Sequence, residues 1–233
     1  MGKLPKCVIP VHLAGSSCNM KAIYKLSKKY GFSIIEDASH AVGASYEGKP
    51  VGSCEYSDIA IFSFHPVKII TSGEGGMALT NSDSLIEKMA LYRSHGITRD
   101  ESLMKHGADG PWYYEMLELG FNYRMTDIAA ALGNSQMKSL DKFVIKRNEI
   151  ADRYDHLLKD LPFITPTRDN KSLSSFHLYI IRVDIQEQPN AHKLLFNKLR
   201  DSGIGVNLHY IPIYRQPCLL YTSDASDEED SVD

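Results

Sequence analysis

A lysine in the first third of the chain lies just beyond a strand and before a glycine-rich turn. The apolar residues 59–62 predict a buried strand, and Lys68 ends the segment 63–68 (SFHPVK) that follows it. Residues 73–76 (GEGG) come next and are too rich in glycine to be helical. Lys68 is therefore expected on a constrained loop. Near apolar walls its amine loses some preference for the charged form, and a neutral amine can condense with an aldehyde. The alternative is a solvated charge on a loop.

The composition favours a small-molecule site over a nucleic-acid or membrane surface. The 233 residues carry a net charge of −3, with 26 basic and 29 acidic side chains, so we expect neither a nucleic-acid partner nor a membrane anchor. No apolar run is long enough to span a bilayer. Four widely spaced cysteines without a C-x-x-C pair predict reduced thiols in a cytoplasmic protein, with no disulfide framework and no metal site.

The first half of the chain alternates strands and helices, as an α/β layer with a mostly parallel sheet does. We expect strands at residues 7–14, 33–36, 59–64 and 76–80, and helices at 20–30 and from about 83 to 93. The first strand, helix and second strand suit a parallel crossover.

The second predicted strand ends on Asp37, and residues 38–41 (ASHA) follow it. Ligands of open α/β sheets bind beyond the carboxyl ends of strands, so this segment is a candidate site. The alternative is an aspartate that caps a helix beside a histidine that is satisfied structurally.

The second half of the chain predicts a smaller α+β domain. Residues 96–118 are expected to form a long ordered loop, and residues 126–158 one long helix or two, with Gly133 as the weakest point. Strands at 177–183 and 205–210 and a helix at 190–201 follow. The predicted domains are 1–130 and 131–217, and residues 218–233 form an acidic tail that we expect to be disordered.

Four segments together resemble the DegT/DnrJ/EryC1/StrS family of sugar aminotransferases. They are residues 36–43 (EDASHAVG), 63–68 (SFHPVK), 73–76 (GEGG) and 120–126 (GFNYRMT). The resemblance covers roughly residues 5–217. It implies a pyridoxal-phosphate (PLP) enzyme of fold type I, with a partial large domain built on a mostly parallel central sheet and part of a small α+β C-terminal domain.

The resemblance also implies roles for five residues. Lys68 matches the lysine that holds PLP covalently and moves the proton, and Asp37 matches the carboxylate that pairs with the pyridine nitrogen. His40 lies where the family places a side chain near the phenolic oxygen of the ring. Ser63 matches a hydroxyl that binds the phosphate. Asn122 matches an amide sent from the neighbouring subunit, which implies a homodimer with a shared active site.

The substrates follow from the same resemblance. The forms SFHPVK and 209–214 (HYIPIY) look most like the branch that aminates C4 of a UDP-linked 4-keto-6-deoxy-N-acetyl-hexosamine in pseudaminic acid synthesis. Glutamate is the implied amino donor. His65, Arg124, His209 and Tyr210 are expected near the sugar nucleotide. For Tyr210 and Arg124 the alternatives are a core edge and a surface ion pair.

Other functions remain open. Family dehydratases replace the lysine with histidine, so Lys68 argues against a PLP-dependent sugar dehydratase. A non-catalytic relative or an inactive fragment predicts no covalent PLP adduct. A nicotinamide-dependent dehydrogenase is disfavoured because no G-x-G-x-x-G follows a strand.

The resemblance does not cover the whole family sequence or the last residues of this chain. The family's N-terminal part, with its Gly-Thr phosphate cradle and the aromatic residue that stacks on the cofactor, has no counterpart here. Residues 218–224 look like translated sequencing-adapter DNA, so we expect residues 218–233 not to be native protein.

Overall fold

The computed structural model describes residues 4–183 and 190–219. By its internal contacts the chain forms two units. The first comprises Met1–Lys159 and Pro166–Tyr179, and the second comprises Asp160–Thr165 and Ile180–Asp233. The predicted division after residue 130 concerns the domains of the whole family fold, and it stays a prediction. Most of the predicted tail, from residue 220 onward, lies outside the described residues.

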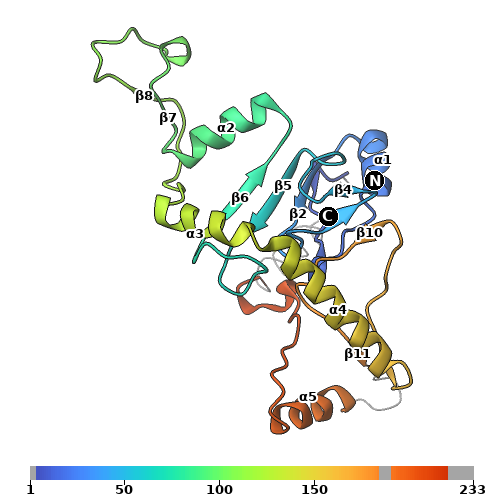
Figure 1. The fold of residues 1–233 in the computed structure, drawn as a ribbon. Coiled ribbons are helices and arrows are strands. Elements are labelled where there is room, and N and C mark those ends of the chain that lie inside the picture. The colour runs from blue at the N-terminus through green and yellow to red at the C-terminus, as the bar shows by residue number, and fades with distance from the viewer. Residues whose placement is uncertain (1–3, 184–189, 220–233) are drawn as a thin grey trace. The chain divides into compact units, whose positions relative to one another are not determined.

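The first unit is built on a four-stranded sheet with the order β1-β2-β5-β6. Its strands are β1 (Cys7–Val8), β2 (Ser33–Asp37), β5 (Ile59–Ser63) and β6 (Gly76–Leu79). β1, β2 and β5 run parallel, while β6 returns antiparallel to β5. Figure 1 shows β2, β5 and β6 side by side. The predicted mostly parallel sheet is confirmed.

Helix α1 (Met20–Tyr30) joins β1 to β2 and has the predicted bounds. The Asn19 side chain caps it by accepting from the Ala22 amide, and Gly31 ends it in the left-handed conformation with φ 74°. The strand before it is shorter than the predicted 7–14. Pro10 cannot donate to a ladder, and Leu13–Gly15 turns as a short 3₁₀ helix, η1.

Side chains of β2 and β5 alternate between a buried and an open face of the sheet. Glu36 pairs with Ala60, and Asp37 pairs with Ile61. Ala60 and Glu36 are buried, whereas Ile61 is 40% exposed. One face of the sheet therefore carries the core, and the other carries the side chains that end the strands.

Two loops and a helix share the main apolar core of the first unit. The core contains Ala38, Ala41, Val42, Ala44, Phe62, Ile69 and Ile70. Leu140 and Phe143 of helix α4 pack against it. The segment that follows β2 and the loop that follows β5 are thus held by the same side chains. Met20, Ile34 and Tyr46 form a second, smaller core.

The remaining strands of the first unit are short. β3 (Ser45–Tyr46), β4 (Lys49–Pro50) and β10 (Ser172–Leu173) form an antiparallel sheet in the order β10-β3-β4.

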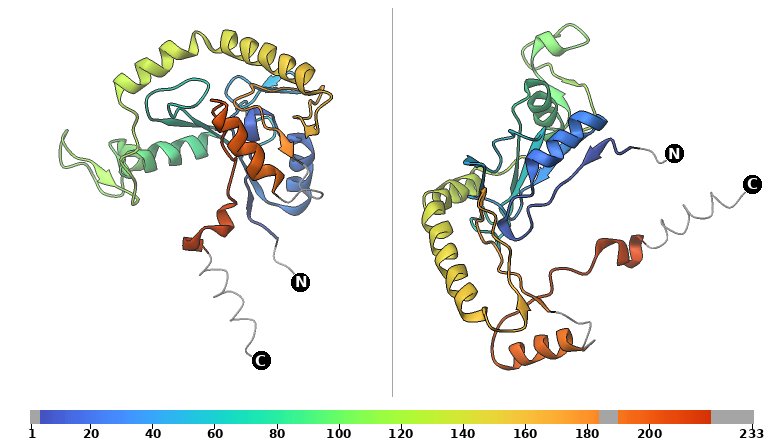
Figure 2. Two further views of the ribbon diagram at one scale, coloured as in Figure 1. Left: turned by 90° about the horizontal axis from the view of Figure 1, so that it is seen from below. Right: turned by 90° about the vertical axis from the view of Figure 1, so that its right-hand side faces the viewer.

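Residues 96–118, predicted as a long ordered loop, form an arm after helix α2 (Asp83–Arg93). The arm contains β7 (Ile97–Thr98), the 3₁₀ turn η2 (Glu101–Leu103) and β8 (Glu115–Met116). It projects away from the four-stranded sheet in Figures 1 and 2. Its order comes from the buried carboxylate of Glu115, which accepts hydrogen bonds from the amides of Lys105 and His106 and from the Tyr113 hydroxyl.

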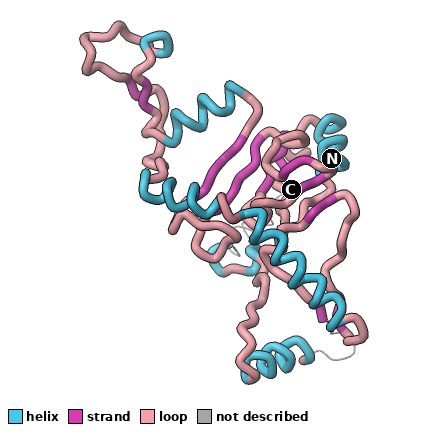
Figure 3. The backbone as a smooth tube through the Cα atoms, viewed as in Figure 1, coloured by secondary structure: helices cyan, strands magenta, loops and turns pink. Residues whose placement is uncertain are grey.

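The long helical segment is two helices, α3 (Asp127–Met137) and α4 (Leu140–Leu158). Figure 3 shows the two in succession. The break falls at Lys138 and Ser139, so Gly133 is not the weak point that we predicted. Gly133 lies inside α3, and the non-helical Ser139 (φ −106°, ψ 1°) allows Leu140 and Phe143 to reach the core.

The described part of the second unit contains the antiparallel pair β9 (Phe163–Ile164) and β11 (Arg182–Val183), helix α5 (Ala191–Asp201) and the 3₁₀ turn η3 (Ile213–Arg215). The predicted helix at 190–201 is confirmed. The predicted strand at 177–183 is wrong except for β11, and residues 205–210 are not a strand. A strand needs a partner strand that satisfies its backbone hydrogen bonds. In the described part of this unit β9 and β11 pair with each other, and residues 205–210 do not join them. Within the described residues, no helix has the length and apolarity needed to cross a membrane.

The lysine loop depends on its buried anchor. Ile70 is 1% exposed, whereas Val67 in the same loop is 63% exposed. We expect Ile70→Ala to lower the free energy of unfolding by roughly 2–5 kcal/mol, because it leaves a cavity in the core. Val67→Ala should change it by less than about 0.5 kcal/mol. Urea unfolding followed by circular dichroism measures both, and equal losses would show that the loop is not anchored through Ile70.

Candidate functional site

Asp37 is the last residue of β2, and its backbone is held on both sides. Its N–H donates to the Pro10 carbonyl at 2.9 Å, and its carbonyl accepts from the His12 N–H at 3.0 Å. One carboxylate oxygen accepts from the Ser39 amide at 3.0 Å. No helix begins here, so the alternative of a helix-capping aspartate is wrong, and Asp37 closes a turn instead. The half-buried carboxylate is thereby fixed at the end of the strand.

A buried pair behind Asp37 fixes the same strand end from the other face. His12 is fully buried and Glu36 is 5% exposed, and His12 Nε2 lies 2.7 Å from Glu36 Oε2. The Cys18 amide lies 3.2 Å from His12 Nδ1, and because a carboxylate can only accept, His12 Nε2 is the donor to Glu36. The Ser57 hydroxyl donates to the other Glu36 oxygen. This buried carboxylate is therefore satisfied by two donors.

The loop that carries Lys68 is closed at its base and anchored in its middle. The Phe64 amide donates to the Gly75 carbonyl at 2.8 Å, and the Ser72 amide donates to the Phe64 carbonyl at 3.0 Å. The Lys68 amide donates to the His65 carbonyl at 2.9 Å. The next two residues, Ile69 and Ile70, enter the core. Lys68 is thus held on an ordered loop, as predicted.

Partial burial lowers the pKa of Lys68 below its ordinary value of 10.5, and the negative charge of Asp37 acts in the opposite direction. The effect of burial is the larger one, so the amine loses part of its preference for the charged form. The two side chains are close enough to interact electrostatically. This is the physical property that the sequence pattern predicted for Lys68.

Ser63 ends β5 on the same face of the sheet as Asp37. Asp37 pairs with Ile61, and residue 63 points to the same side as residue 61. The Ser63 hydroxyl accepts from the His65 amide at 3.4 Å. A carboxylate, a hydroxyl and an amine with a lowered pKa therefore gather at the carboxyl ends of β2 and β5.

His40 lies in the turn after Asp37 and is buried. Its Nδ1 accepts from the Ala14 amide at 3.3 Å, and its ring centroid is 4.5 Å from that of His177. The Ser175 hydroxyl donates to the His40 carbonyl at 3.1 Å. The sequence analysis found His40 but missed Ser175 and His177, because they are 135 residues or more away and no local motif marks them.

The other predicted site residues of the first unit are exposed. His65 lies 3.7 Å from the Glu74 carboxylate on its own loop. Arg124 forms no ion pair with any described residue, and its expected contact with a sugar nucleotide stays a prediction. Asn122 forms an isolated antiparallel bridge with Ser94, beside the stacked rings of Phe121 and Tyr123.

His209 and Tyr210 belong to the second unit. Their rings stack with centroids 4.1 Å apart, and Tyr210 is 61% exposed, so it is not a core edge. Their expected contact with a sugar nucleotide stays a prediction.

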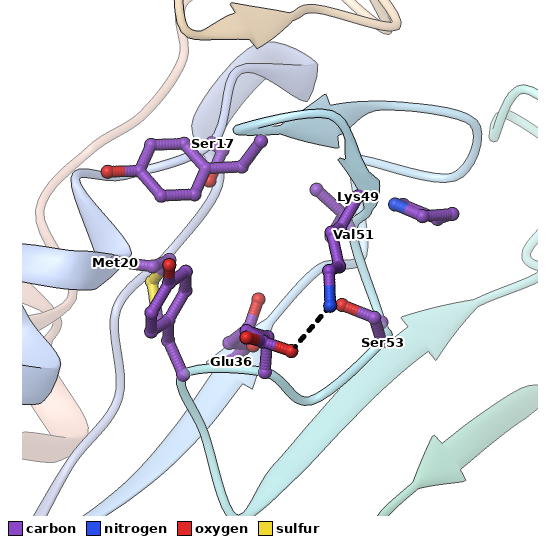
Figure 4. Close-up of a pocket in the computed structure, with 11 residues that line it drawn as sticks. Ser17, Met20, Glu36, Lys49, Val51 and Ser53 are labelled. Atoms are coloured by element: carbon purple, nitrogen blue, oxygen red, sulfur yellow. Dashed lines mark hydrogen bonds and ion pairs between the residues drawn. The ribbon is translucent and has the colours of Figure 1, made fainter.

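A small pocket elsewhere in the first unit is not this site. It has a volume of about 20 Å³, room for roughly one water molecule. Figure 4 shows Ser17 and Met20 on one side, Lys49, Val51 and Ser53 on the other, and Glu36 between them. The dashed line is the ion pair between Lys49 and Glu55, with a 3.0 Å separation. None of the predicted site residues lines it.

Known aminotransferases resemble this chain in sequence and in structure. The sequence model of the DegT/DnrJ/EryC1/StrS aminotransferase family matches residues 3–232. The UDP-4-amino-4,6-dideoxy-N-acetyl-β-L-altrosamine transaminase of Campylobacter jejuni is 43% identical over 206 residues, which are 88% of this chain and 51% of that protein.

Solved structures of aminotransferases also resemble this chain. PseC of Helicobacter pylori, an aminotransferase involved in pseudaminic acid biosynthesis, superposes with a TM-score of 0.83 at 36% identity, over 93% of this chain and 55% of that one. The PLP form of a putative sugar aminotransferase from Streptococcus pneumoniae superposes with a TM-score of 0.78 at 28% identity, over 93% and 57%.

These matches cover only part of each relative. The chain spans about half the length of the curated relatives it matches, 51% to 54% for those compared. The family match runs through residue 232 and does not stop at residue 217, so it gives no support to a non-native tail, which stays a prediction.

The predicted fold class is confirmed by this structural likeness to PLP-dependent aminotransferases of fold type I. The match over nearly the whole chain also confirms the predicted resemblance. The chain belongs to the DegT/DnrJ/EryC1/StrS aminotransferase family.

Proposed function

We propose that this chain carries the lysine side of the PLP site of a nucleotide-sugar aminotransferase. The observation that carries the proposal is the pair Lys68 and Asp37, an amine with a burial-lowered pKa that interacts with a carboxylate at the carboxyl ends of two parallel strands. In an aminotransferase of this family, such an amine can hold the aldehyde of PLP and such a carboxylate can pair with the pyridine nitrogen.

The side chains at the site fit the polar groups of PLP. The Lys68 amine is the group that would hold the aldehyde carbon. The Asp37 carboxylate would pair with the protonated pyridine nitrogen, and the Ser63 hydroxyl would donate to the phosphate. The His40 Nδ1 accepts from the Ala14 amide, so Nε2 carries the proton of the neutral ring and can donate to the phenolic oxygen. No two of these roles compete for the same atom.

The proposed chemistry divides between the cofactor and the protein. When bound, PLP supplies an electron sink for the electron pair left when a proton leaves the carbon next to nitrogen. Asp37 favours the protonated ring that makes this sink effective. Lys68 takes the proton from one carbon and returns it to the other, and its lowered pKa leaves more of the amine in the neutral form that can accept a proton.

The proposed substrates are an amino acid, with glutamate as the donor expected in the family, and C4 of a UDP-linked 4-keto-6-deoxy-N-acetyl-hexosamine. The Campylobacter jejuni and Helicobacter pylori relatives carry the names of such transaminases, which supports this choice. His65 and Arg124 are exposed side chains that can approach the phosphates or the sugar, and His209 and Tyr210 are proposed to join them.

We further propose a homodimer in which Asn122 reaches the site of the neighbouring subunit. The exposure of Asn122, with the exposed rings of Phe121 and Tyr123 beside it, supports a role outside its own fold. A cytoplasmic location is proposed as well, since Cys7, Cys18, Cys54 and Cys218 are all free thiols.

The proposal predicts a covalent adduct at one lysine. After incubation with PLP and reduction with borohydride, we expect about one pyridoxyl group per chain, and peptide mass mapping should place it on Lys68. A neutral, held amine reacts better than the solvated lysines do. Lys68→Ala should remove the adduct without creating another.

Scattered labelling, or none, would favour a fragment that cannot build the site. The same experiment on a longer chain that includes the family's N-terminal part separates that outcome from a wrong function, because absence of the adduct there as well would reject the transaminase. With such a chain, turnover with glutamate that survives Lys68→Ala would remove Lys68 from its role.

The electrostatic pairing makes a separate prediction without PLP. Since the Asp37 charge raises the pKa of Lys68, Asp37→Asn should lower it further, and the midpoint of acetylation of Lys68 against pH should move to lower pH. Mass spectrometry follows the labelling, with the exposed Lys25 as internal reference. Glu74→Gln removes a charge from the lysine's own loop and serves as the matched control. An unchanged midpoint in Asp37→Asn, or equal shifts in both variants, would contradict the pairing.

A further inference from the structure

We propose that the open face of the four-stranded sheet is a docking surface for a separate polypeptide with the sequence of the family's N-terminal part. Docking there also covers the candidate site, because Asp37 and Ser63 lie on the same face. The docking itself depends only on the fold, whereas its effect on PLP binding rests on the proposed function.

The open face carries exposed apolar side chains on both sides of Asp37. Val11, in the segment that continues β1, forms a parallel bridge with Asp37, and Ile61 of β5 pairs with Asp37 from the other side. Ile9 lies two residues before Val11 and therefore on the same face, whereas the buried His12 points to the opposite face. Ile9 is 59% exposed, Val11 47% and Ile61 40%. These three residues form an exposed strip.

Both apolar cores of the first unit lie on the opposite face of the sheet. Phe62 of β5 belongs to the main core, and Ile34 of β2 belongs to the smaller one. Helix α4 packs against the first core through Leu140, and α1 contributes Met20 to the second. Neither core contains a residue of the exposed strip. The described helices α1 and α4 thus cover the face that the strip does not occupy.

The arrangement of the strands calls for a cover on the open face as well. β1, β2 and β5 are parallel, and parallel sheets in proteins have both faces covered. The outer strands of this sheet, β1 and β6, each pair with a single strand among the described residues. The unpaired N–H and C=O groups of an edge strand can pair with a further strand. The sheet therefore offers a partner one apolar face and two edges.

The size of the relatives indicates which partner fits. The superposed part is 93% of this chain but 55% of PseC, and the matched part of the Campylobacter jejuni relative is 51% of its length. Close to half of each relative therefore lies outside the match, which is enough chain for further strands and covering helices. A second copy of this chain fits less well. A symmetric contact of two open faces would bring two Asp37 carboxylates toward each other across an apolar interface.

Co-expression tests the docking with the whole chain. The probe is the part of the Campylobacter jejuni relative that precedes its matched residues, produced with an affinity tag beside this chain. We expect the chain to co-purify with the probe in a 1:1 ratio. Absence of the chain from the purified probe would overturn the proposal.

Two matched variants locate the contact on the molecule. Ile9→Asp should lower the amount of chain that co-purifies by about tenfold or more, because docking would bury a carboxylate against apolar side chains. Leu26→Asp is the control, since Leu26 on α1 is similarly exposed, at 48%, but lies outside the strip. It should co-purify like the unmodified chain. Circular dichroism confirms that both variants fold.

Equal co-purification of the two variants would overturn the assignment of the open face. The alternative occupant has its own signature in size-exclusion chromatography of the chain without the probe. A dimer that Ile9→Asp converts to a monomer would show that the face binds a second copy, and it would overturn the choice of partner.

A last measurement connects docking to the candidate site. The PLP concentration for half-maximal labelling of Lys68 should be at least about tenfold lower in the complex than in the chain alone, because a covered site excludes water and adds contacts. An unchanged concentration would overturn the effect on PLP binding. If the complex forms and Lys68 takes up no PLP, the proposed function fails while the docking stands. If the chain alone is labelled and no complex forms, the docking fails while the proposed function stands.

Discussion

The candidate site depends on how the end of β2 is held. His12 binds this strand end twice, with its amide on the Asp37 carbonyl and its ring on the Glu36 carboxylate. The pair is buried, and a buried carboxylate is stable only when its oxygens are satisfied, which the His12 ring and Ser57 achieve together. Asp37 therefore stands on a strand end that cannot shift without leaving a buried charge unpaired.

The lysine is fixed relative to that aspartate through apolar contacts. Ala38, next to Asp37, and Ile69, next to Lys68, pack in one core. The two functional groups thus share neighbours although they come from different loops. A packed core transmits position well, because its side chains have few alternative arrangements. Burial of the same loop lowers the pKa of Lys68, so the packing that places the amine also adjusts its charge.

Local signals predicted most of the first unit and the centre of its site. The apolar spacing and Gly31 gave the bounds of α1, and the apolar run before Ser63 gave β5, because these depend on neighbours in sequence. The strand predicted at 177–183 failed except for β11, because Arg147 donates to the His177 carbonyl and the Leu178 amide donates to the Ala14 carbonyl, and no local pattern reports partners so far away. Ser175 and His177 were missed for the same reason. Asn122, His209 and Tyr210 rest on resemblance alone.

Two neighbouring carboxylates show how one strand divides structural from chemical work. Glu36 and Asp37 are adjacent, so the alternation of a strand sends them to opposite faces. On the buried face, Glu36 is saturated by His12 and Ser57 and can accept little more. On the open face, Asp37 accepts one amide bond and keeps acceptor positions for a cationic partner. Composition cannot distinguish the roles of Glu36 and Asp37, but their positions in the strand can. Glu36 lies two residues after Ile34 and pairs with Ala60, and these buried residues show which face of the sheet is the core.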